Sequence, residues 1–145
     1  MSGITIGIDL GGTRIKAVAI DEQGQILHLI NHPTNDDDDQ IWKNAIASAV
    51  QEIQRKFKNT DTPVGISAPG LPNADNSAIA YMPGRLQGLE NFIWSDFLNF
   101  RTYVLNDAVS AMMAEARYGA AKGRKNVVML TLGTGVGGAI LINGK

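Results

Sequence analysis

The amino-acid sequence predicts an α/β fold. Three observations indicate this class: a meander of short apolar runs at the N-terminus, a long amphipathic helix after it, and further short strands that alternate with helical segments. The strands of the meander are expected at residues 4–9, 15–20 and 26–31. In the first run Ile4, Ile6 and Ile8 alternate with polar or small residues, which is the period-2 pattern of a half-buried strand.

The long helix is expected over residues 42–57. Apolar side chains recur there at three- and four-residue steps, from Trp42 through Ile46 and Ile53 to Phe57. Charged and amide side chains occupy the other face of the helix. A stripe of this kind packs against a sheet, so the helix is interpreted as structural.

Length and composition exclude several classes of function. The 145 residues suffice for one domain, and a net charge of −1 with scattered basic residues indicates no nucleic-acid surface. No apolar run is long enough for a transmembrane helix, and no signal peptide is visible. The absence of cysteine excludes disulfides and cysteine metal sites within these residues, and it fits a cytoplasmic protein.

A glycine turn follows the first strand. The strand ends in Asp9, and Gly11, Gly12 and Thr13 lead into the second strand, so a tight hairpin is expected in which glycine adopts a positive φ. Outward-pointing backbone N–H groups and the Thr13 hydroxyl suit a phosphate, and the Asp9 carboxylate suits Mg²⁺ held through water. The alternative is an ordinary glycine hairpin beside an incidental aspartate.

A second glycine turn repeats this arrangement near the C-terminus. Two apolar runs, residues 127–132 and 139–142, flank a segment that contains Gly133, Thr134, Gly135 and Gly137. Two such hairpins would hold the phosphates of one nucleotide from two sides. Neither glycine segment precedes a helix, which disfavours a Rossmann dinucleotide site.

Two other predicted strands end in residues of chemical interest. Residues 64–67 run into a loop that contains Pro69 and Gly70, and residues 103–105 end at Asn106 and Asp107. An aspartate between a strand and a helix is most often an N-cap. The alternative is a second carboxylate at the end of a core strand, like Asp9.

Two polar segments complete the pattern. Four successive aspartates, residues 36–39, are interpreted as a solvated loop whose last members cap the helix, in preference to a cation site. Residues 75–91 form a long irregular stretch, which is usually functional or disordered.

Four motifs in series resemble the ROK family of bacterial sugar kinases and related repressors. They are Asp9-Leu10-Gly11-Gly12-Thr13, Ala68-Pro69-Gly70, Asn106-Asp107-Ala108, and the glycine-rich run from Leu132 to Gly138. The resemblance implies the actin-like ATPase (ribonuclease H-like) fold, in which two lobes each hold a mixed sheet flanked by helices and the active site lies between them. Residues 1–119 would then be the N-terminal lobe, and residues 120–145 the beginning of the C-terminal lobe.

The resemblance also implies ATP-dependent phosphorylation of a sugar hydroxyl, with Mg²⁺. Asp107 matches the catalytic base and Asn106 a sugar ligand, while Pro69 and Gly70 match a loop near the sugar. The two glycine turns match the phosphate loops, with Asp9 at the metal. A carboxylate that accepts the hydroxyl proton and clustered donors for the phosphoryl group are what this chemistry requires. The full-length form is expected to be a homo-oligomer.

Two other functions remain open: a sugar-responsive ROK regulator, and another actin-like phosphotransferase. Regulators of the family carry a helix-turn-helix ahead of the kinase-like part, whereas here the first strand begins at Ile4, which favours the kinase. Family motifs for the sugar and most of the adenine pocket would lie beyond residue 145, and the chain stops inside an Asn-Gly turn. We therefore expect an N-terminal fragment that is inactive by itself, and the motifs present do not choose among hexoses and amino sugars.

Overall fold

The chain divides into two compact units, Met1–Leu105 and Asn106–Lys145. The structure is a computed structural model, and it describes residues 3–58, 61–133 and 135–145. The sequence placed a lobe boundary after residue 119, whereas the compact units meet after Leu105. The division of the chain into lobes stays a prediction.

The first unit is built on a five-stranded mixed sheet with the strand order β3-β2-β1-β4-β7. Its strands are β1 (Thr5–Leu10), β2 (Arg14–Ile20), β3 (Ile26–Pro33), β4 (Val64–Ala68) and β7 (Thr102–Asn106). β2 pairs antiparallel with β1 and with β3, which confirms the predicted meander, and β1 pairs parallel with β4. Because β1 and β4 run in the same direction, their carboxyl ends lie at one edge of the sheet.

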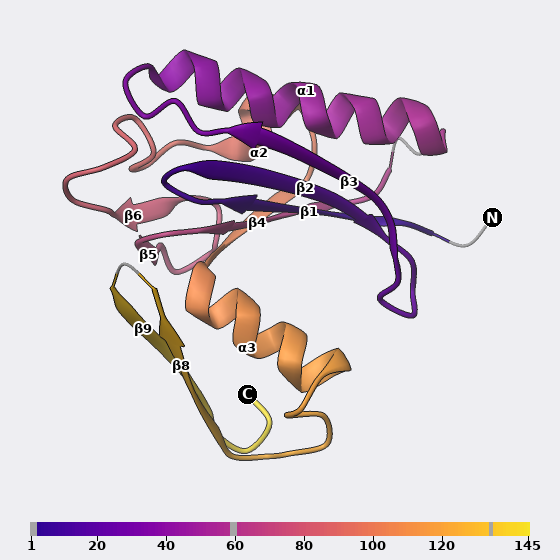
Figure 1. Ribbon diagram of the computed structural model, residues 1–145, viewed down its shortest axis with the longest axis vertical. Helices are drawn as coiled ribbons and strands as arrows, with labels where there is room; N and C mark the ends of the chain where they lie inside the picture. The colour runs from indigo at the N-terminus through magenta and orange to yellow at the C-terminus, as the bar shows by residue number, and fades with distance from the viewer. Residues whose placement is uncertain (1–2, 59–60, 134) are drawn as a thin grey trace. The chain divides into compact units, whose positions relative to one another are not determined.

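Helix α1 (Asp39–Phe57) covers one face of this sheet, as Figure 1 shows. It begins three residues before the predicted start because the Asp38 side chain accepts the Gln40 N–H at 2.9 Å and caps the first turn. It ends at Phe57, and the C-cap residue Lys58 has a φ of 52°, the left-handed conformation common after helix C-termini.

The core of the first unit lies between α1 and the sheet. Its largest fully buried side chains are Trp42, Trp94, Ile6, Leu10, Ile15, Ile46, Ile53, Ile66, Ile79, Leu86 and Leu89. The alternation along β1 directs Ile6, Ile8 and Leu10 inward, and the helical stripe of α1 meets them. Burying one side chain of this size stabilises the fold by about 1.5–3 kcal/mol.

The segment between β4 and β7 crosses the unit as short elements and loops. It contains the paired strands β5 (Leu71–Pro72) and β6 (Ile79–Tyr81), and the short helix α2 (Trp94–Leu98). The sequence predicts an irregular stretch over residues 75–91, which is wrong in part because β6 lies within it. Leu86 and Leu89 of the same stretch are fully buried. These two leucines attach the long loop to the core.

The second unit consists of one helix and one hairpin. α3 (Asp107–Tyr118) packs on the hairpin formed by β8 (Val127–Leu132) and β9 (Val136–Leu141), whose antiparallel pairing confirms the predicted strand-turn-strand unit. The second strand begins at Val136 rather than at residue 139, so Gly137 lies in β9, paired with Thr131, and not in the turn. The other face of the hairpin is apolar and exposed, with Val128, Leu130, Leu132, Val136, Ile140 and Ile142 each at least 60 % accessible.

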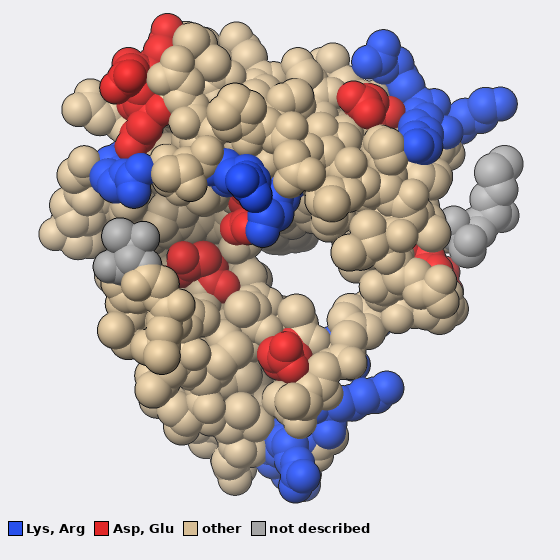
Figure 2. All heavy atoms as spheres, viewed as in Figure 1, with Lys and Arg blue, Asp and Glu red and all other residues tan. Residues whose placement is uncertain are grey.

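Two properties of the described residues bear on the surroundings of the protein: the apolarity of the helices and the distribution of surface charge. None of the helices in the described part is long and apolar enough to cross a membrane. Figure 2 shows basic side chains in separate groups among acidic ones on the face in view. The formal net charge of the whole sequence is −1.

Candidate functional site

The first glycine turn is closed by a backbone hydrogen bond, in which the Gly11 N–H donates to the Arg14 carbonyl at 3.0 Å. Neither Gly11 nor Gly12 has a positive φ, so the conformational reason expected from the sequence is wrong. Space is the reason instead. A Cβ atom on Gly11 would lie 2.9 Å from the Arg14 carbonyl oxygen, which is closer than real Cβ contacts.

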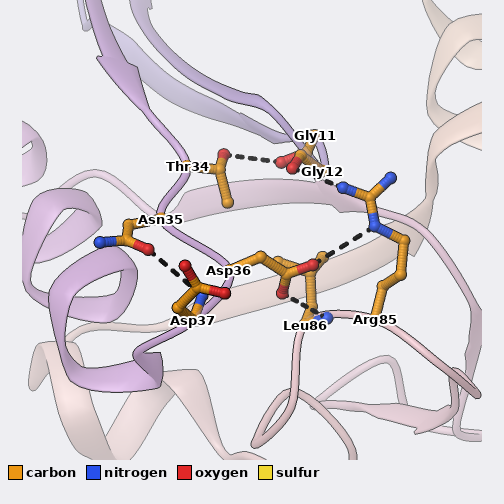
Figure 3. A network of polar contacts seen from close by, with 8 residues as sticks. All are labelled: Gly11, Gly12, Thr34, Asn35, Asp36, Asp37, Arg85 and Leu86. Carbon is orange, nitrogen blue, oxygen red and sulfur yellow. Dashed lines mark hydrogen bonds and ion pairs between the residues drawn. The ribbon is translucent and has the colours of Figure 1, made fainter.

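Three successive carbonyl groups of this turn, those of Gly11, Gly12 and Thr13, are held from outside the hairpin, and Figure 3 shows the contacts to the first two. The Thr34 hydroxyl donates to the Gly11 carbonyl at 2.7 Å, and the Thr34 N–H donates to the Thr13 carbonyl at 3.0 Å. Between them, Nη2 of Arg85 donates to the Gly12 carbonyl at 2.7 Å. The turn therefore has a fixed orientation.

The aspartates of residues 36–39 form separate interactions and not one shared site. Asp36 accepts the Leu86 N–H at 2.6 Å and Nε of Arg85 at 3.3 Å. The Lys43 ammonium donates to Asp39 at 2.6 Å and holds the pKa of that carboxyl below its usual range. Asp38 caps α1, which confirms the capping interpretation, and no metal-binding group of three side chains occurs among the described residues.

Asp9 lies at the edge of the sheet where the turn begins. It is exposed near the end of β1, opposite Lys16 of β2 and Ser67 of β4. A single exposed carboxylate fits Mg²⁺, which usually keeps several waters and takes one or two protein carboxylates together with substrate phosphates.

The loop that carries Pro69 and Gly70 follows β4 at the same edge. Gly70 has a φ of 99°, and a Cβ atom there would lie 2.6 Å from the Tyr81 carbonyl oxygen. Both the backbone conformation and the close approach to β6 require glycine. Within the first unit, the parallel pairing of β1 with β4 thus gathers Asp9, the first glycine turn and this loop.

Asn106 and Asp107 begin the second unit. Asn106, not Asp107, is the N-cap of α3, because its side-chain oxygen accepts the N–H groups of Ala108 at 2.9 Å and Val109 at 3.3 Å. Asp107 is the first residue of the helix, its carboxylate is exposed, and it also accepts the Ala108 N–H at 2.8 Å. The capping alternative weighed for Asp107 is therefore wrong, since asparagine performs that task.

The second glycine turn is open on its outer side. The Gly133 N–H donates to the Gly135 carbonyl at 2.9 Å, and a Cβ atom on either glycine would meet nothing within 4 Å. Thr134 lies outside the described residues. Gly137 differs, because a Cβ atom there would lie 2.5 Å from the Thr131 hydroxyl oxygen and 3.5 Å from Ala108. Gly137 thus lets β9 approach the first turn of α3.

Sequence reasoning found neither Thr34 and Arg85 as partners of the first glycine turn nor Asp36 as the partner of Arg85. Arg85 is 73 residues from Gly12 and 49 from Asp36 along the chain, so no local spacing connects them. The signals present were weak: an acidic residue ahead of a helix, and an arginine after the Pro83-Gly84 pair in a long loop.

The chain resembles known proteins along nearly its whole length. Residues 5–145 match the model of the ROK family. The glucokinase of Streptomyces coelicolor is 38 % identical over 146 residues, which cover 99 % of this chain and 45 % of that protein. The chain spans about half the length of the curated relatives it matches.

Solved structures agree with this assignment. A ROK family glucokinase from Streptomyces griseus, crystallised with glucose and AMPPNP, has a TM-score of 0.84 and 33 % identity over 99 % of this chain and 46 % of its own. An inorganic polyphosphate/ATP-glucomannokinase from Arthrobacter has a TM-score of 0.85 and 31 % identity over 99 % of this chain and 60 % of its own. The predicted α/β fold of the ROK, actin-like type is thereby confirmed.

Proposed function

Because this chain belongs to the ROK family, we propose that it supplies phosphate-binding and sugar-binding elements of an ATP-dependent sugar kinase. The substrate class is a hexose or an amino sugar. The observation that carries the proposal is the first glycine turn, whose three carbonyl groups are held by Thr34 and Arg85 at the sheet edge that also carries Asp9. A turn whose backbone is anchored in this way can present the N–H groups of Gly12 and Thr13 to a phosphate chain.

Asp9 is the proposed magnesium residue, and it would hold the ion through water. When bound, the metal would neutralise charge on the phosphates. Gly133, Thr134, Gly135 and Gly137 belong to the proposed second phosphate loop. The open space around Gly133 and Gly135 supports this assignment, because a bound anion could approach the backbone there.

Asp107 is the proposed general base. As the sugar oxygen forms its bond to the γ-phosphorus, the bond from that phosphorus to ADP breaks, and the hydroxyl proton passes to the Asp107 carboxylate. The position of Asp107 supports this role, since the carboxylate is exposed and is not needed as the helix cap. Asn106, Pro69 and Gly70 are the proposed sugar-binding residues, and the cap fixes the side-chain orientation of Asn106.

Ligand titration of the 15N-labelled chain tests this proposal by NMR. Adding AMPPNP with Mg²⁺ is expected to shift the amide signals of Gly12, Thr13 and Gly135, and adding glucose or N-acetylmannosamine is expected to shift that of Gly70. Shifts confined to α1 or β3 would contradict the assignment. Turnover is tested in a fusion of residues 1–145 to the part of the Streptomyces coelicolor glucokinase beyond its match, called the fusion enzyme below.

A further inference from the structure

We propose that Arg85, held by Asp36, is a positioning residue that orients the first glycine turn for phosphate binding. This inference rests on the proposed function, because it assigns a role in the same phosphate site. All the residues involved lie in the first unit. Figure 3 shows Arg85 reaching from its loop to the turn on one side and to Asp36 on the other.

Peptide geometry connects the held carbonyls to the phosphate. In a trans peptide the carbonyl of one residue and the N–H of the next point in opposite directions. The Thr34 hydroxyl fixes the Gly11 carbonyl, and Arg85 fixes the Gly12 carbonyl. The N–H groups of Gly12 and Thr13 must then point away from these two donors. Arg85 therefore sets the direction of the Thr13 N–H, one of the amides expected to meet the phosphate.

Asp36 holds both the side chain of Arg85 and the backbone next to it. Nε of Arg85 donates to Asp36 Oδ2 at 3.3 Å, and the N–H of the next residue, Leu86, donates to Asp36 Oδ1 at 2.6 Å. Leu86 is 2 % exposed and belongs to the core. One carboxylate thus accepts hydrogen bonds from both the backbone beside Arg85 and its guanidinium, so the arginine extends to the turn from a segment anchored to the core.

Arginine and glycine are matched at this contact. A Cβ atom on Gly12 would lie 2.5 Å from Nη2 of Arg85, so the space left by the missing side chain is occupied by the guanidinium. The planar fork of arginine serves a carbonyl and a carboxylate at the same time, whereas a lysine ammonium acts as a point charge. Gly12 and Arg85 therefore form one structural contact that requires both residue types, although 73 residues separate them.

The test compares anion affinity in folded variants of the whole 145-residue chain. The 15N-labelled chain is titrated with inorganic tripolyphosphate in the presence of Mg²⁺, and the Kd is read from the Gly12 and Thr13 amide signals. Arg85→Met is expected to raise this Kd by on the order of tenfold or more, because the turn loses a charge-assisted hydrogen bond. Arg85→Lys is expected to recover little of the loss. Asp36→Asn, which removes the acceptor of Nε but keeps one for Leu86, gives a smaller increase.

Arg101→Met is the matched control, since Arg101 is exposed and its removal changes the net charge equally. It is expected to leave the Kd within about twofold. A melting temperature is measured for every variant, because a purely structural role lowers it without changing the Kd of the folded chain. Should Arg85→Met fail to fold, Asp36→Asn decides the question by the same readout.

The outcomes separate the two proposals. If wild type binds tripolyphosphate at the turn and Arg85→Met or Arg85→Lys binds equally well, the positioning role is overturned and the proposed function stands. If saturating tripolyphosphate leaves the Gly12 and Thr13 signals of wild type unchanged, the phosphate role of the turn fails, and the positioning role fails with it. A selective loss of affinity in Arg85→Met supports both.

Discussion

The replacement of Gly70 by alanine tests why the loop after β4 requires glycine at this position. At a φ of 99° an alanine is strained, which costs about 1–3 kcal/mol. Its Cβ atom would also lie 2.6 Å from the Tyr81 carbonyl oxygen and 2.7 Å from the Ile79 side chain. Overpacking of this kind costs about a further 1–3 kcal/mol. The free energy of unfolding should therefore fall by about 2–6 kcal/mol, a large part of the 5–15 kcal/mol typical of a domain.

Gly84→Ala is the matched control. Gly84 also has a positive φ, 89°, but a Cβ atom there would meet nothing within 4 Å. Its replacement is expected to cost only the backbone strain. The reduced entropy of the unfolded chain that accompanies any glycine-to-alanine change cancels when the two variants are compared. The difference between them should thus be the steric cost alone, about 1–3 kcal/mol.

Urea unfolding followed by tryptophan fluorescence measures both variants. The chain has two tryptophans, and both Trp42 and Trp94 are fully buried in the first unit, so the signal reports that unit. The midpoint should fall further for Gly70→Ala than for Gly84→Ala, at an unchanged slope. Equal midpoints would refute the argument, because they would mean that β6 moves away from the new side chain at no cost.

Four further outcomes are expected. In the fusion enzyme, Asp107→Asn should lower kcat by on the order of 10²–10⁴ with an unchanged melting temperature, and persistent activity would count against the general base. Gly135→Val should raise the KM for ATP more than that for sugar, while an equal effect on both would oppose the phosphate role. Lys43 lowers the pKa of Asp39, so the stability that this pair contributes is present above the ordinary pKa of 3.8 and is lost as the pH falls below it. In Lys43→Met the urea midpoint should therefore fall less than in wild type when the pH is lowered through this range. Leu130→Lys should reduce self-association of the chain, measured by light scattering, because Leu130 lies on the exposed apolar face of the hairpin.

Much of the fold could be predicted because its signals are local. The alternation of Ile4, Ile6 and Ile8 and the stripe that begins at Trp42 are repeated within a few residues, and burial on one face is sufficient to produce them. The start of α1 was less predictable. It depends on which of four adjacent aspartates accepts a helical N–H, and Asp38 is selected by backbone geometry.

The irregular parts could not be predicted in this way. Leu86 and Leu89 lie in a stretch without periodicity, and their burial depends on how the loop crosses the core. The sequence also could not predict whether Asn106 or Asp107 is the helix N-cap, because both side chains can accept an N–H. The N-cap is the residue that keeps an extended backbone. Asn106 does, with a ψ of 145°.

The glycines illustrate the limit most clearly. A glycine pair in the sequence indicates a tight turn. It does not indicate which atoms of the fold occupy the space that a side chain would need. At Gly11 the space is occupied by the carbonyl of Arg14, three residues away, whereas at Gly12 it is occupied by the guanidinium of Arg85. A motif that looks self-contained therefore depends on a distant loop. Substitutions at Arg85 should consequently affect the turn as directly as substitutions within it.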